Sequence, residues 1–211
     1  MAGLLCLQGG RELTSECEDM DRYVLHRSRA RRVAVLAGAA RVGSDYAQAS
    51  ERARRHYEAL GASVSIVPDP RDDVGAAVAA LADDIGLVVL PGGSPSSLLA
   101  VLTGELRARL THLQHEGAAI SGASAGAMVL CQRMARPDRD GEVVEALGLV
   151  EGMALPHWSP GSGAGGDSST IAWGLPECGG VVIDGTSCVA VGRGTPSIRA
   201  GGRWRAIERD D

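Results

Sequence analysis

Five short apolar runs alternate with helical patterns in the first part of the chain, and this alternation constrains the fold more than any other feature. The runs are apolar at successive positions, as in parallel strands that are buried on both faces. Strands that alternate with helices require right-handed crossovers. We therefore expect a three-layer, doubly wound α/β fold with a mostly parallel sheet. The runs are Gly3–Gln8, Arg32–Ala37, Ser63–Val67, Ile85–Leu90 and Ala118–Ser121.

The pattern changes after Gly152. A Gly/Ser-rich stretch over 159–166 reads as a loop, and the segment after it is too short to fold alone, so we expect a single domain over residues 1–211. Short strand patterns separated by Asp184-Gly185 and Gly201-Gly202 predict hairpins, and hence an antiparallel C-terminal edge on the sheet. These strand patterns are Gly180–Ile183, Cys188–Val191, Ser197–Ala200 and Trp204–Ile207.

Composition excludes several functional classes. The net charge of −5 argues against a nucleic-acid partner, and no apolar run is long enough for a signal peptide or a membrane span, so we expect a cytoplasmic protein without a membrane partner. The five cysteines show no metal-ligand spacing and no disulfide framework. We predict core or free thiols and no metal site.

The segment Gly122-Ala123-Ser124-Ala125-Gly126 has the G-x-S-x-G pattern between a strand and a helix predicted over Ala127–Met134. Small residues on both sides of a serine allow a sharp turn that exposes its hydroxyl, as in a nucleophile elbow. The alternative is a Gly/Ala-rich turn with an incidental serine. Cys131, seven residues after Ser124, is a further nucleophile candidate, but its apolar surroundings favour packing.

A second loop can assist the serine. Leu90 is followed by Pro91-Gly92-Gly93, and Ser94 and Pro95 read as the N-cap and first residue of a helix. Both loops lie at the carboxyl ends of parallel strands, where open sheets place their sites. The backbone N–H groups of Gly93 and Ala125 are therefore candidates for an oxyanion hole.

A serine nucleophile needs a base. His157 follows Met153-Ala154-Leu155-Pro156, at the predicted end of a strand downstream of the elbow, and we assign it as the general base. The other histidines fall within charged amphipathic helical stretches, which favours a solvated helix face for each of them. They are His26, His56, His112 and His115.

Taken together, these motifs resemble the cyanophycinase and peptidase E family in the same order along most of the chain. The resemblance rests on Leu7-Gln8-Gly9-Gly10, Pro91-Gly92-Gly93, the Ser124 elbow, Pro156-His157 and Ile183-Asp184-Gly185-Thr186. It implies a flavodoxin-like, class I glutamine amidotransferase-like fold and a serine peptidase without metal or cofactor. It also implies a Ser-His-acid triad and hydrolysis of peptide or isopeptide bonds next to aspartate.

On this resemblance, Ser124 matches the nucleophile and His157 the base, and the acid is expected between them. Glu142 fits the cyanophycinase-like spacing best and is our first choice. Asp138 and Asp140, in a charged turn, stay open as alternatives, and the same interval also contains Glu145 and Glu151.

The resemblance fails at one point that concerns the substrate. Relatives carry charged and amide residues directly after Pro-His, whereas residues 158–166 here carry no charge. Arg11 or Arg41, each after a predicted strand, could bind an acidic substrate instead. We expect a small peptide substrate and a homodimer. The alternatives are an esterase or amidase of other specificity and a catalytically inactive, amidotransferase-like binding protein.

Overall fold

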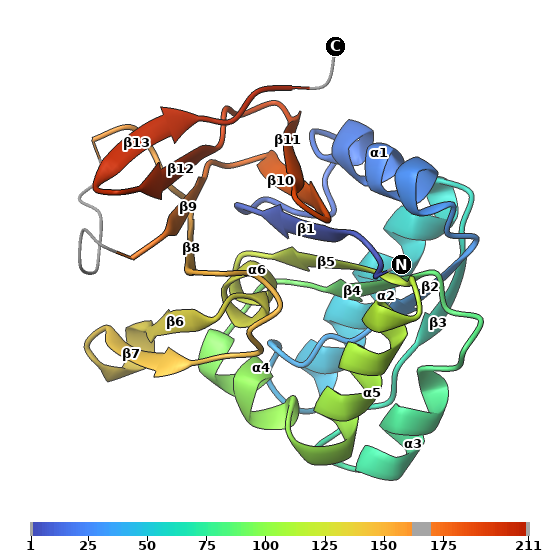
Figure 1. Cartoon of the computed structure of the whole chain (residues 1–211). Helices are drawn as coiled ribbons and strands as arrows, with labels where there is room; N and C mark the ends of the chain where they lie inside the picture. The colour runs from blue at the N-terminus through green and yellow to red at the C-terminus, as the bar shows by residue number, and fades with distance from the viewer. Residues whose placement is uncertain (1, 162–169, 210–211) are drawn as a thin grey trace.

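The computed structural model describes residues 2–161 and 170–209, so most of the predicted Gly-rich loop lies outside the described residues. The predicted fold class is confirmed: helices cover both faces of a seven-stranded, mostly parallel sheet (Figure 1). Its strand order is β11-β10-β1-β5-β4-β2-β3. The strands are β1 (Leu5–Gln8), β2 (Arg32–Val35), β3 (Ser63–Ile66), β4 (Leu87–Leu90), β5 (Ala119–Ala123), β10 (Gly179–Asp184) and β11 (Ser187–Gly192).

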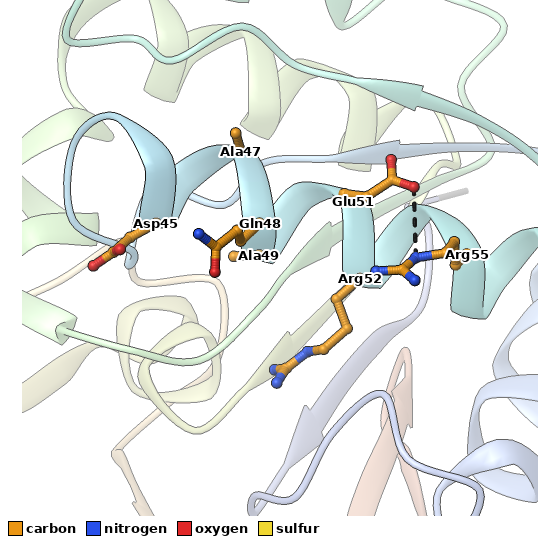
Figure 2. Close-up of a pocket in the computed structure, with 7 residues that line it drawn as sticks. All are labelled: Asp45, Ala47, Gln48, Ala49, Glu51, Arg52 and Arg55. Carbon is orange, nitrogen blue, oxygen red and sulfur yellow. Dashed lines mark ion pairs between the residues drawn. The ribbon is translucent and has the colours of Figure 1, made fainter.

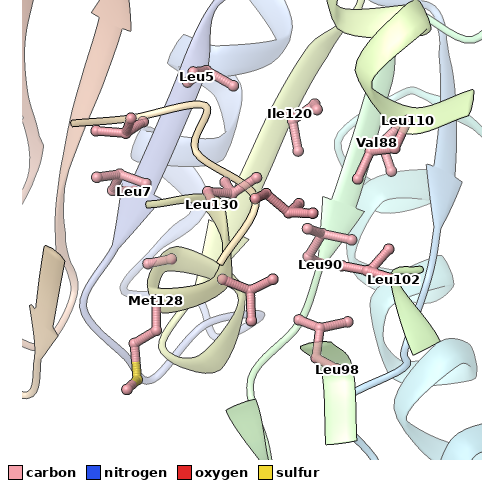
Figure 3. Packing of buried hydrophobic residues seen from close by; sticks show 14 of the residues in the cluster. Leu5, Leu7, Val88, Leu90, Leu98, Leu102, Leu110, Ile120, Met128 and Leu130 are labelled. Carbon is pink, nitrogen blue, oxygen red and sulfur yellow. The ribbon is translucent and has the colours of Figure 1, made fainter. Parts of the chain in front are cut away.

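The two faces of this sheet carry separate hydrophobic clusters. Successive side chains of a strand point to opposite faces, so Leu5 and Leu7 of β1 join one cluster while Leu4 and Cys6 join the other. Helices α1 (Glu18–Ser28) and α2 (Ser44–Ala59) contribute to the second cluster. The first cluster, shown in Figure 3, is covered by α3 (Val74–Ala80), α4 (Pro95–Val101), α5 (Gly104–His115) and α6 (Ala125–Leu130).

The antiparallel edge is present, but only half of the predicted strands build it. β10 pairs antiparallel with β1, and β11 pairs with β10. The last two strands instead belong to a separate four-stranded sheet of order β13-β12-β9-β8, which lies beside the main sheet (Figure 1). Its members are β8 (Met153–Pro156), β9 (Ala172–Leu175), β12 (Ser197–Ala200) and β13 (Arg203–Ala206).

The helix after the elbow is shorter than predicted. It ends at Leu130 rather than Met134, because the chain turns at Cys131 into a two-stranded hairpin. The carbonyl groups of Val129, Leu130 and Cys131 accept backbone hydrogen bonds from Leu147, Leu149 and Gly148 respectively. The hairpin consists of β6 (Arg133–Arg136), a 3-10 turn (Pro137–Arg139) and β7 (Glu142–Glu145).

A buried polar cluster joins α1, α2 and the central strands. The Asp21 carboxylate, 1% exposed, accepts hydrogen bonds from Gln8 and Tyr57, and His56 Nε2 lies 2.8 Å from its Oδ2. The prediction of a solvated His56 is therefore wrong, because its side chain is only 8% exposed. Within the described residues, no helix is both long and apolar enough to cross a bilayer.

Candidate active site

Ser124 lies in a tight turn between β5 and α6, with a positive φ of 49°. Glycines on both sides make this turn possible. A Cβ on Gly122 would lie 2.5 Å from the carbonyl carbon of Gly126, and a Cβ on Gly126 would lie 2.2 Å from the carbonyl oxygen of Leu90. Any side chain at either position would collide with backbone, so the elbow pattern has a steric cause.

His157 follows β8 and faces this serine. Its Nε2 lies 2.9 Å from Oγ of Ser124. The residue has a positive φ of 56°, and its backbone N–H donates to the carbonyl of Gly9, which fixes the loop against the end of β1. The two residues that sequence reasoning chose as nucleophile and base thus lie within hydrogen-bond distance.

The carboxylate beside the imidazole belongs to Glu177, whose Oε1 lies 2.7 Å from Nδ1 of His157. A proton on Nδ1 is donated to this carboxylate, which leaves Nε2 free to accept the Ser124 proton. Both side chains are accessible, with exposed fractions of 54% for His157 and 46% for Glu177. Ser124, His157 and Glu177 therefore form one hydrogen-bonded chain that opens to solvent.

Sequence reasoning missed Glu177, although the sequence contains a signal for it. Leu155-Pro156-His157 and Leu175-Pro176-Glu177 both place a titratable residue after an apolar run and a proline. The two runs are β8 and β9, which pair in parallel with Pro156 opposite Leu175. Parallel strands end at the same edge, so the two Leu-Pro-X ends bring His157 and Glu177 side by side.

The structure does not bring Glu142, the first choice for the acid, to His157. Glu142 stands opposite Arg136 in the β6–β7 hairpin and forms an ion pair with it at 3.6 Å. Asp138 accepts a hydrogen bond from Ser96, which is the main cause of its lowered pKa, and Asp140 is an exposed turn residue. Among the contacts of the described residues, Glu142 and Asp138 thus pair with Arg136 and Ser96 rather than with His157.

Gly10 packs against the His157–Glu177 pair. A Cβ built on it would lie 2.5 Å from Cε1 of His157 and 2.8 Å from Oε2 of Glu177, and its φ of +152° disfavours other residues. The Gly10 carbonyl accepts the N–H of Cys178, next to Glu177. The backbone of the Gly9-Gly10 segment therefore packs against the His157–Glu177 pair and leaves no room for a side chain at Gly10.

The predicted oxyanion groups lie beside the serine. Gly93 and Ala125 both line a cavity that contains Ser124. Ala125 is the first residue of α6, so its N–H has no acceptor inside that helix. The predicted capping is confirmed: the Ser94 side chain accepts from the N–H of Ser97, and Pro95 follows it as the first helical residue.

A carboxylate that sequence reasoning did not select holds the glycine loop. Glu12 Oε1 accepts the N–H of Gly92 at 2.9 Å. A Cβ built on Gly92 would lie 2.7 Å from that oxygen and 3.3 Å from Cβ of Ser124, so the carboxylate and the nucleophile flank the same point. On the far side of the loop, the Ser94 N–H donates to the carbonyl of Ala39. The loop that carries Gly93 is thus anchored on both sides.

The two arginines proposed for substrate binding do not line this cavity. Arg11 forms an ion pair with Glu16 at 2.6 Å, and Arg41 is an exposed residue between β2 and α2. The cavity has a volume of about 490 Å³.

Cys131 does not compete with Ser124 as a nucleophile. All five are free thiols, and four of them are buried. Burial raises the pKa of the Cys131 thiol to about 12, so it stays protonated and unreactive at neutral pH. Its Sγ contacts the carbonyl of Ala127, in agreement with the packing role expected for it.

A second depression, of about 690 Å³, runs along α2 (Figure 2). All its lining residues come from that single helix, most are exposed, and Glu51 and Arg55 form an ion pair at 3.5 Å. It holds no nucleophile, so we place the site at Ser124. Within residues 2–161 and 170–209, no group of three His, Cys, Asp or Glu side chains has a geometry that could hold a metal ion.

Comparisons with known proteins bear on the family and the fold. The family model described as peptidase family S51 matches residues 4–171. A peptidase from an acI-B1 Actinobacterium superposes with a TM-score of 0.83 at 22% identity, covering 100% of this chain and 96% of that one. A candidate peptidase E protein from Listeria monocytogenes EGD-e gives a TM-score of 0.67 at 16% identity, covering 92% and 100%. At these identities both structures support the fold. A search of curated proteins finds no match.

Proposed function

Because the chain belongs to peptidase family S51, we propose that it is a serine-type peptidase that hydrolyses small peptides through Ser124, His157 and Glu177. The observation that carries this proposal is the continuous contact from Ser124 Oγ to His157 Nε2 and from His157 Nδ1 to Glu177 Oε1, at 2.9 and 2.7 Å. A nucleophile, a base and a carboxylate that orients the base are the parts that acyl transfer needs.

In the first step, His157 Nε2 takes the proton of the Ser124 hydroxyl while Oγ attacks the scissile carbonyl carbon. The N–H groups of Gly93 and Ala125 donate to the oxygen that becomes negative. The C–N bond then breaks, and the amine leaves with the proton from His157. The product of this step is an ester between Ser124 and the acyl part of the peptide.

In the second step, a water gives a proton to His157 and attacks the ester carbonyl. The C–Oγ bond breaks, Ser124 regains its proton from His157, and the carboxylic acid leaves. Glu177 keeps one imidazole tautomer and stabilises the imidazolium in both steps, without itself becoming protonated. One peptide and one water thus give an amine and an acid, with the protein unchanged.

The aspartyl specificity implied by the family resemblance is the first substrate class to test. An esterase or amidase would use the same three residues on other substrates. An inactive binding protein would keep the elbow as architecture only. The accessible His157–Glu177 pair favours turnover, because water can reach the acyl-enzyme from solvent.

A fluorophosphonate probe tests the proposal directly. We expect covalent labelling of the wild-type protein at Ser124 and hydrolysis of at least one peptide in a dipeptide library. Ser124→Ala should abolish labelling and lower turnover by about four to six orders of magnitude. Ser63→Ala, at an exposed position in the edge strand β3, is the matched control and should label like the wild type. A wild-type protein that neither labels nor hydrolyses any library peptide would be a binding protein.

A further inference from the structure

The cavity beside Ser124 is walled by apolar side chains from four separate parts of the fold. Met128 of α6 lies at the edge of the core cluster (Figure 3), and Leu155 comes from the end of β8. Pro95 begins α4, and Pro137 follows β6 in the hairpin. Among the described lining residues, His157 is the single titratable group. A substrate side chain that enters here therefore meets mainly apolar groups and, among the described lining residues, no Asp, Glu, Lys or Arg side chain.

Trp158 forms a closely packed part of this wall. Its side chain lies over the backbone of Gly174, where a Cβ would come within 2.6 Å of the indole Cδ2. Trp204 of β13 also contacts the ring, at a centroid distance of 4.9 Å. The backbone N–H of Trp158 donates to the carbonyl of Leu175. Gly174 is thus needed because the indole occupies the space of its side chain.

The indole also carries an unused donor. Trp158 is 9% exposed, and its Nε1 is a buried polar atom that has no hydrogen-bond partner among the described residues. A buried donor without an acceptor is unfavourable, so the indole is held here by its packing against Gly174 and Trp204 rather than by a hydrogen bond of its side chain to the described residues.

The cation nearest in sequence to this wall is already neutralised. Arg136 lies between the two lining residues Ala135 and Pro137, but it contacts Glu142 at 3.6 Å, Asp138 at 3.9 Å and the hydroxyl of Ser96. One guanidinium and two carboxylates together carry a net negative charge, so this cluster does not attract a further carboxylate. A carboxylate buried in the cavity would lose its hydration without gaining a counter-ion, which is costly.

We propose that this cavity binds an uncharged, apolar side chain of the peptide residue next to the scissile bond, with Trp158 as a specificity-determining residue. The inference rests on the proposed function and names its substrate class: small peptides with an aliphatic or aromatic residue at the cleaved bond, rather than aspartate. A volume of about 490 Å³ lies within the usual range for small-ligand sites. Apolar pockets discriminate on the order of tenfold to a few hundredfold in kcat/KM.

The test uses the purified full chain and two dipeptide series, X-Ala and Ala-X, where X is Leu, Phe, Met, Ala, Asp or Arg. Product release gives kcat/KM for each peptide, and fluorophosphonate labelling is measured on the same sample. We expect Leu, Phe and Met to exceed Asp by at least about tenfold in one series. A preference for Asp or Arg, no preference, or labelling without hydrolysis in either series overturns the inference and leaves the serine-hydrolase assignment standing. Failure to label overturns both.

Variants at two lining residues test whether the cavity wall selects the substrate side chain. Ala135→Arg adds a cation to the wall on the partly exposed hairpin and should shift the Asp/Leu ratio of kcat/KM at least tenfold towards Asp. Ala47→Arg, the same change on the exposed side of α2, should leave the ratio unchanged. Trp158→Phe leaves a smaller aromatic ring in the wall, and we expect the Leu/Ala ratio of kcat/KM to change severalfold. A Trp158→Phe protein with the wild-type ratio, or an Ala135→Arg protein that folds with an unchanged ratio, contradicts the proposal.

Discussion

Glu177 Oε1 lies 2.7 Å from His157 Nδ1 although about half of each side chain is exposed to solvent. Water screens an ion pair in such a position and competes for the carboxylate. The short contact is maintained by the backbone on both sides, because His157 and Cys178 are hydrogen-bonded to Gly9 and Gly10. The orientation of the imidazole therefore depends on the glycine segment as well as on the carboxylate.

Replacing the carboxylate by its amide tests this relationship. Glu177→Gln allows the imidazole to adopt the wrong tautomer, and we expect kcat to fall about a hundredfold to a thousandfold. A buried acid would give roughly ten-thousandfold, and solvent access at Glu177 reduces the effect. Glu142→Gln is the matched control, since Glu142 pairs with Arg136, and should change kcat by less than about twofold. A larger loss in Glu142→Gln would return the role to the hairpin.

The close packing of Gly10 against the His157–Glu177 pair gives a second prediction. Gly10→Ala places a methyl group against the imidazole and the carboxylate, so kcat should fall at least about tenfold. Gly61→Ala is the control: it also has positive φ, at 90°, but nothing lies within 4 Å of its added Cβ. Both variants should lose stability, on the order of 1 kcal/mol for Gly61→Ala, and only Gly10→Ala should lose activity. Thermal unfolding and steady-state kinetics separate the two effects.

Thiol chemistry distinguishes this site from a cysteine hydrolase. Burial raises the pKa values of Cys6, Cys17 and Cys131 to about 12, which keeps these thiols protonated and unreactive at pH 8. Cys188 is exposed. Iodoacetamide should therefore modify Cys188 of the native protein first, without loss of activity, as mass spectrometry and a hydrolysis assay will show. Inactivation that accompanies alkylation of Cys131 would argue for a thiol nucleophile.

Glu12 is expected to position the glycine loop. Glu12→Ala frees the Gly92 N–H and loosens the segment that carries Gly93, so kcat should fall about tenfold while KM changes little. Glu12→Gln retains an oxygen acceptor and should restore most of the loss. A variant pair that loses activity equally would indicate that the charge of Glu12, rather than its hydrogen bond to Gly92, is what matters.

The central fold could be predicted from the sequence because its signals are local. β1 to β5 are short apolar runs, and the Ser94-Pro95 cap and the Ser124 elbow each consist of consecutive residues with a recognisable pattern. The helix end at Leu130 was not predictable in this way, since backbone groups of residues 147–149 complete it from beyond the hairpin. Hydrophobic pattern alone does not specify which sheet a strand joins, so β12 and β13 were assigned to the wrong one.

The candidate site could also be predicted only where its signals are local. Ser124 and His157 each follow a recognisable local pattern, whereas the partner of His157 is set by the parallel pairing of β8 with β9. An acid sought between serine and histidine could only be Glu142 or one of its neighbours. Glu177 comes 20 residues after His157, and only the repeated Leu-Pro ending marks it.

Ser124 and His157 both stand on backbone with positive φ, at 49° and 56°. Such a conformation costs a non-glycine residue of the order of 1–3 kcal/mol, and glycine relieves it. A laboratory selection that rewards heat resistance alone would thus favour glycine at the two positions on which the proposed chemistry depends. Directed evolution for heat resistance therefore has to screen for turnover in every round, since glycine at either position removes a side chain of the proposed triad.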